Sequence, residues 1–180
     1  MALAIAGSSL ACGAPSSHIV HVSPAEFRGT MSVSKPESAR PHNKRSPAGL
    51  AEESLHSRGF RFGTDGSVGA LLAYAQGEFD RIPPEQARDG DLVFFDTGTG
   101  CGGHVGVAET AEASGRIGFR EWRGGSSRHS FATPRAPIYR RDEHGRILNT
   151  FLRPKRMDDP EDTRYFAGDM LCAAFRVEAK

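Results

Sequence analysis

The sequence predicts an α+β domain in which a helix packs on a small antiparallel sheet. An apolar stripe at helical spacing occupies residues 66–76, and short apolar or alternating segments separated by glycine-rich turns follow residue 92. The chain has 180 residues, which is enough for one domain with a buried core. We therefore expect a single folded domain over residues 48–180.

The first 47 residues are expected to lie outside this domain. Residues 1–12 form a small, apolar run ending at Cys12, which resembles the end of a bacterial lipoprotein signal whose cysteine becomes the lipidated first residue. No Lys or Arg precedes the run and Ser9 stands where leucine is usual, so an ordinary disordered N-terminus is the alternative. Residues 13–47 are rich in Ser, Pro and Ala without apolar periodicity, which is typical of a disordered linker.

The elements of the domain are predicted in the following order. A short helix begins near residue 48 and ends before Gly59, and Asp65 is placed to cap a second helix over 66–76. Strands are predicted at 92–95, 104–109 and 116–122, the first two joined by the Gly/Thr loop 97–103. The polar turn 142–145 predicts a hairpin between 138–139 and 147–152, and a last strand is predicted over 165–177.

Composition narrows the classes of partner and cofactor. Lys plus Arg number 23 against 22 Asp plus Glu, so no strong field favours nucleic acid, and none is expected as a partner. No apolar run approaches the roughly 18 residues of a membrane-spanning helix. The three cysteines are odd in number and widely spaced, which predicts neither a disulfide framework nor a CxxC metal pair. We expect no metal and no other cofactor.

Two motifs lie close together in the middle of the chain. Residues 88–95 read RDGDLVFF, a tight turn that leads into an apolar strand, and residues 104–108 read HVGVA. The second strand thus opens with His104, directly after a glycine-rich loop. An imidazole at a strand end beside such a loop is a common position for a general base.

With the helix start at residues 65–67, these motifs resemble the NlpC/P60 and CHAP branch of papain-like cysteine peptidases and amidases. The resemblance covers roughly residues 55–122 and implies a papain-like fold. It also implies a cysteine nucleophile at a helix N-terminus, a histidine that accepts its proton and a polar residue that orients the histidine. The last two roles fall on His104 and Glu121. The alternatives are a surface histidine at a strand end and a solvated carboxylate paired with Arg120 or Arg123.

The nucleophile is the point at which the sequence departs from the family. Gly66 stands at the cysteine's position, where it can form no covalent acyl intermediate, and Phe60 replaces a tyrosine that commonly helps to stabilise the oxyanion. Ser67 is adjacent but would point in another direction. Cys101, three residues before His104, is a weak alternative nucleophile or an ordinary loop cysteine. Cys172 is predicted as a buried strand residue, His129 as a surface residue and Asp91 as a turn residue.

The resemblance therefore predicts a domain related to peptidoglycan-cleaving cysteine amidases and endopeptidases, impaired or inactive for want of a nucleophile. Whether it is an enzyme stays open, and a damaged reading frame of an active relative is a further alternative. A non-catalytic module of the same fold that binds peptide or peptidoglycan is the main alternative. The implied partner is a peptidoglycan stem peptide. The implied location is the bacterial cell envelope, with a cytoplasmic location as alternative and membrane contact only through a lipid on Cys12.

Overall fold

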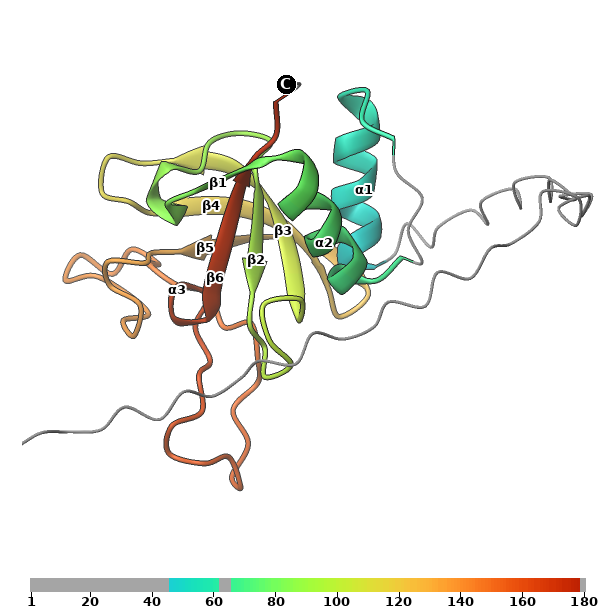
Figure 1. Cartoon of the computed structure of the whole chain (residues 1–180). Coiled ribbons are helices and arrows are strands. Elements are labelled where there is room, and N and C mark those ends of the chain that lie inside the picture. Colours follow the sequence, from blue (N-terminus) through green and yellow to red (C-terminus); the bar gives the residue numbers. More distant parts are fainter. Residues whose placement is uncertain (1–45, 62–65, 179–180) are drawn as a thin grey trace, which may run out of the picture. The chain divides into compact units, whose positions relative to one another are not determined.

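The computed structural model describes residues 46–61 and 66–178, all of which belong to one compact unit. The expected signal with Cys12, nearly all of the expected linker, and Asp65 lie outside the described residues. The described part combines helices with an antiparallel six-stranded sheet in the order β1-β6-β2-β3-β4-β5, which confirms the α+β class (Figure 1). Its elements are α1 (Pro47–Ser57), α2 (Val68–Glu78), β1 (Asp80–Ile82), a 3-10 turn (Pro84–Gln86), β2 (Leu92–Phe95), β3 (His104–Ala111), β4 (Ile117–Arg123), β5 (Ser126–Ala132), α3 (Ala167–Met170) and β6 (Leu171–Arg176).

The two faces of the sheet are covered differently. Helices α1 and α2 pack on one face, where their buried residues join those of β2, β3 and β6, among them Phe94 and Val105. The other face carries Phe95 and Phe119 and is covered by the segment that follows β5, which contributes Leu152 and Met170. Alternation along β2 and β3 thus sends successive side chains to opposite cores. Both faces of the sheet are buried, which explains the unbroken apolar run of β2.

Helix α2 begins two residues later than predicted. Its N-cap is Ser67, whose hydroxyl accepts a hydrogen bond from the Ala70 amide at 3.1 Å. Serine is as good a cap as aspartate, and the helical periodicity alone does not distinguish them. Leu71 and Ala75 are buried in the core as the apolar stripe predicted.

The C-terminal third differs most from the prediction. The predicted hairpin is present only as its turn: backbone hydrogen bonds close residues 142–145 and an isolated antiparallel bridge joins Arg141 and Ile147, but no strands form over 138–152. The last strand is shorter than predicted, because residues 167–170 form α3. Buried Asn149 holds this irregular segment in place, since its amide accepts hydrogen bonds from the Thr133 and Gly168 amides and donates to two carbonyls. These side-chain bonds replace the ladder that a hairpin would have supplied.

Asp91, predicted as a turn residue, is a buried anchor. Only 1% of it is exposed. Its carboxylate accepts hydrogen bonds from the Arg88 and Val177 amides and from the Arg176 guanidinium at 2.9 to 3.1 Å. The aspartate of the RDGDLVFF motif therefore fastens the start of β2 to the end of β6, a structural role.

The glycine of the second motif is required by a close approach between strands. A Cβ built on Gly106 would lie 2.5 Å from Cδ2 of Phe119 and 3.1 Å from the Arg120 carbonyl oxygen. Phe119 thus occupies the space above β3 that a side chain would fill. The glycine of the HVGV motif is consequently required for the packing of β3 against β4, whatever the role of His104.

Candidate functional site

His104 and Glu121 form a buried hydrogen-bonded pair on neighbouring strands. Gly106 of β3 is directly opposite Glu121 of β4, so His104 is the diagonal neighbour of Glu121 on the same face. His104 Nε2 lies 2.6 Å from Glu121 Oε2. The histidine is 8% exposed and the carboxylate is fully buried. The contact that the sequence predicted is present, while its catalytic role stays a prediction.

Two further groups hold the carboxylate. The Ser130 hydroxyl of β5 donates to Glu121 Oε1 at 2.5 Å, and Arg123 approaches the same oxygen at 3.2 Å. Burial by itself raises the pKa of Glu121, but the hydrogen bonds from His104 and Ser130, with the nearby charges of His104 and Arg123, hold it below its usual value of 4.5. Glu121 is therefore ionised in the folded protein at neutral pH.

The ionised carboxylate fixes the hydrogen on the histidine ring. A carboxylate only accepts hydrogen bonds, so Nε2 of His104 must carry the hydrogen that Glu121 accepts. In the neutral ring this leaves Nδ1 with a lone pair. Glu121 would also stabilise the imidazolium formed when Nδ1 takes up a proton, which is the role of an orienting carboxylate beside a general base.

We expect the stability of this protein to fall in acid partly through Glu121. Its pKa is lower in the folded state, so the unfolded chain is the first to bind a proton as the pH falls. The stabilisation by Glu121 is complete above about pH 4.5 and is lost as the pH falls from there through the lower folded-state value. Urea unfolding at several pH values checks this: the free-energy gap between wild type and Glu121→Gln should narrow below pH 4.5. A gap that is independent of pH would contradict the assignment.

A cavity of about 390 Å³ opens beside His104. Trp122, on the strand of Glu121, forms part of its wall, and the start of α1 lies at its edge. The described lining residues are Pro47, Thr97, Gly103, His104, Trp122, Arg123, Gly124, Leu152, Arg153 and Pro154. Among them, Thr97 is the one hydroxyl-bearing side chain, and no thiol is present. His104 therefore borders a ligand-sized space without a strong nucleophile in its described wall.

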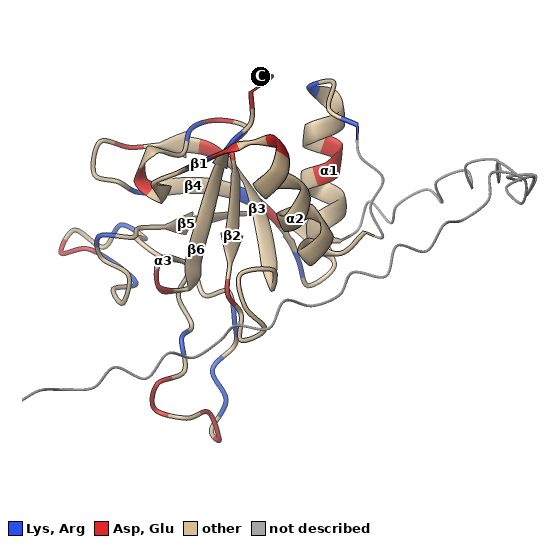
Figure 2. Ribbon diagram, viewed as in Figure 1, with Lys and Arg blue, Asp and Glu red and all other residues tan. Residues whose placement is uncertain are grey.

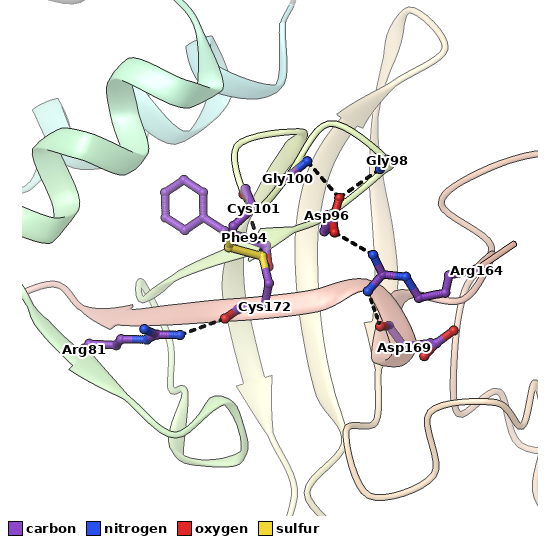
Figure 3. Close-up of a disulfide and its surroundings, with 9 residues drawn as sticks. All are labelled: Arg81, Phe94, Asp96, Gly98, Gly100, Cys101, Arg164, Asp169 and Cys172. Atoms are coloured by element: carbon purple, nitrogen blue, oxygen red, sulfur yellow. Dashed lines mark hydrogen bonds and ion pairs between the residues drawn. A yellow bond between two sulfur atoms is a disulfide. The ribbon is translucent and has the colours of Figure 1, made fainter. Parts of the chain in front are cut away.

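Cys101 is not a free thiol, because it forms a disulfide with Cys172 of β6, 71 residues later in the sequence (Figure 3). The expectation of no disulfide was wrong. Cys172 lies on a strand, as predicted, but it is half-buried and disulfide-bonded and not a simple buried residue. As a weak alternative nucleophile Cys101 is also excluded in this oxidised state, since the thiolate is the reactive species. The sequence missed the pair because the two residues meet only when β2 and β6 are adjacent.

The loop that leads to His104 is held at two points. Besides the disulfide, Asp96 accepts hydrogen bonds from the Gly98 and Gly100 amides at 2.9 and 3.0 Å and pairs with Arg164 at 2.5 Å (Figure 3). The Gly98 amide and the Arg164 hydrogen bond lower the pKa of Asp96, so this carboxylate remains charged in mild acid. The glycine-rich loop is thus a fastened structure with a fixed path.

Gly66, the position of the expected nucleophile, is not brought into the cavity. It precedes the N-cap of α2, and neither it nor Ser67 is among the described residues that line the space at His104. The backbone of Gly66 has a φ of +80°, in the left-handed region. A cysteine there would be strained by about 1–3 kcal/mol. The backbone at Gly66 therefore does not suit a cysteine, so this position is not simply a family nucleophile site in which glycine has replaced cysteine.

Sequence reasoning missed Ser130, Trp122 and the arginines around the cavity. Ser130 lies on β5, an edge strand whose polar sequence has no apolar alternation to reveal it. The available signal for Ser130 was its position on a segment that follows a glycine turn after the strand of Glu121, where a polar side chain can reach that carboxylate. His129 is exposed, as predicted. The described residues contain no cluster of metal-binding side chains, and no helix among them is long and apolar enough to cross a membrane.

Comparison with known proteins gives no match: no protein-family model fits the chain, and neither a curated protein nor a solved structure is significantly similar to it.

Proposed function

We propose that this chain is a papain-like domain of the NlpC/P60–CHAP type that binds a peptide, such as a peptidoglycan stem peptide, without cleaving it through a covalent cysteine intermediate. The observation that carries this proposal is the cavity beside the His104–Glu121 pair, whose described wall contains no thiol. A fixed imidazole and a neighbouring indole can bind a peptide by hydrogen bonding and stacking. The RDGDLVFF and HVGVA motifs are the support for the NlpC/P60–CHAP type in this proposal.

The disulfide supports a location outside the cytoplasm. Structural disulfides persist in oxidising compartments and are rare where thiols are kept reduced. The Cys101–Cys172 bond fastens the loop beside the cavity, so its stability would matter to ligand binding. This agrees with the proposed cell-envelope ligand.

Hydrolysis is the second candidate, and the geometry of His104 favours it. A histidine oriented by a buried carboxylate can remove a proton from water as well as from a thiol. Such an enzyme would need no side-chain nucleophile. The same experiment separates the two functions.

We expect a soluble stem-tetrapeptide fragment of peptidoglycan to change the fluorescence of Trp122 in a saturable way. Trp122 is the only tryptophan of the chain and lines the cavity, so all of the tryptophan emission comes from a residue in its wall. His104→Ala should weaken binding about tenfold, as loss of a hydrogen bond to a buried polar group does. His144→Ala, at an exposed turn residue outside the cavity, is the matched control.

The outcomes divide as follows. Saturable binding without new amino termini supports the binding function. New amino termini that disappear in His104→Ala would establish hydrolysis instead. Absence of any fluorescence change at millimolar fragment would refute the proposal.

A further inference from the structure

A second cavity, of about 440 Å³, lies beside the first. The two share five lining residues, namely Arg123, Gly124, Leu152, Arg153 and Pro154. The two cavities are therefore adjacent, and we call them together the His–Arg groove, with His104 at one end. The far end is lined by Arg128 and Arg140 together with Phe151.

Four arginines line this second cavity, and no acidic side chain is among its described lining residues. Arg123 is paired with Glu121 and Arg153 with Asp159, so these two are already neutralised. Arg128 and Arg140 form no ion pair among the described residues. Arg128 contacts the Ser126 hydroxyl at 3.3 Å, and Arg140 lies over the Phe151 ring at 5.2 Å.

The positive charge of this cavity is a local feature and does not reflect a basic protein. The whole chain has a formal net charge of only +1, and basic and acidic positions both occur along the segment that follows β5 (Figure 2). Arg128 is directly opposite Glu121 in the ladder and so lies on the sheet face of the His104 pair. Two guanidinium groups that have no carboxylate partner among the described residues thus line a recess adjacent to the candidate site. A guanidinium binds oxyanions through two parallel hydrogen bonds.

We propose that the arginine end of the His–Arg groove binds a carboxylate of the ligand, with Arg128 and Arg140 as the recognising groups. This rests on the proposed function and narrows the ligand to a peptide with a free carboxylate near the part that lies at His104. Leu152, Phe151 and Pro154 give the recess apolar walls, which fit a peptide side chain better than a bare phosphate. The shared chemistry is an oxyanion, so the test must distinguish carboxylate from phosphate.

The direct test follows the side-chain Nε–H signals of Arg128 and Arg140 by NMR while glutarate, a simple dicarboxylate, is added at low ionic strength. We expect saturable shifts of both signals, and binding about tenfold weaker or worse in Arg128→Gln/Arg140→Gln. Arg135→Gln, at an exposed arginine outside the groove, should bind as wild type does. Absence of shifts, or inorganic phosphate binding more tightly than glutarate, would overturn the proposal.

A second experiment, with peptide ligands, distinguishes failure of this proposal from failure of the proposed function. The stem-tetrapeptide fragment with a free C-terminal carboxylate should bind about tenfold more tightly than its C-terminal amide, and the double arginine variant should remove the difference. Equal binding of both forms would overturn the carboxylate site and leave the proposed function standing. If glutarate binds but neither peptide does, the proposed function fails and the groove is an anion site for a different ligand.

Discussion

Replacing Glu121 with alanine is expected to destabilise the protein by about 3–5 kcal/mol, the range for breaking a buried charged network by removing one partner. Glu121 is fully buried and is contacted by His104, Ser130 and Arg123. Its removal leaves these three groups without their shared acceptor. It also leaves a cavity where the carboxylate was.

Equilibrium unfolding in urea near pH 7 measures this loss. Glu143→Ala, at a residue whose side chain is 86% exposed, is the control and should change stability by less than about 0.5 kcal/mol. Glu121→Gln should be milder than alanine, because the amide keeps the volume and one acceptor oxygen. Equal stability of Glu121→Ala and wild type would show that the network does not hold β3, β4 and β5 together.

Removing the disulfide by Cys101→Ala/Cys172→Ala is expected to lower the free energy of unfolding by about 4 kcal/mol, because the bond closes a loop of 71 residues in the unfolded chain. For a domain of this size the loss corresponds to a fall in Tm of roughly 10–15 °C. The loss has a local consequence as well. The loop before His104 would keep the contacts of Asp96 and the hydrogen bond from the Gly103 amide to the Gly100 carbonyl, but it would lose its covalent link to β6.

Thermal unfolding with and without dithiothreitol tests this. Wild type should lose stability when reduced, and the double variant should be insensitive to the reductant. His129→Ala, at an exposed residue of β5, serves as the control for substitution at the surface. If reduction leaves the Tm of wild type unchanged, the bond contributes nothing to stability.

Much of the fold was predictable because local periodicity was strong. The strands β2, β3 and β4 lie within one or two residues of their predicted ranges, since apolar runs and glycine turns mark them. Strand β5 was missed because its sequence, SSRHSFA, carries polar residues at an edge of the sheet. The turn near residue 145 formed as predicted, but its strands did not, because the side chain of Asn149, instead of a strand ladder, satisfies the neighbouring backbone.

The candidate site was predictable only where its members lie on adjacent strands. His104 and Glu121 are 17 residues apart across a single turn, which makes their strands neighbours, but a one-residue register shift between Ala108 and Thr110 decides that both side chains lie on one face. Cys101 and Cys172 are far apart in sequence, and nothing in their local pattern indicates that β2 and β6 are neighbours. The sequence also gave no reason to group Arg128, Arg140 and Arg153, which come from a strand and from irregular segments.

The sequence by itself determined the α+β class and the neighbouring strands that carry His104 and Glu121, because these depend on side-chain alternation and short turns. The register shift that brings the two side chains to one face appears only in the folded sheet. Only the tertiary structure decided that Cys101 is a disulfide partner, that Asp91 is a buried anchor and that arginines converge on a groove. Each of those facts depends on contacts between segments separated by tens of residues. Such contacts are fixed by how the whole chain packs, and no local pattern encodes them.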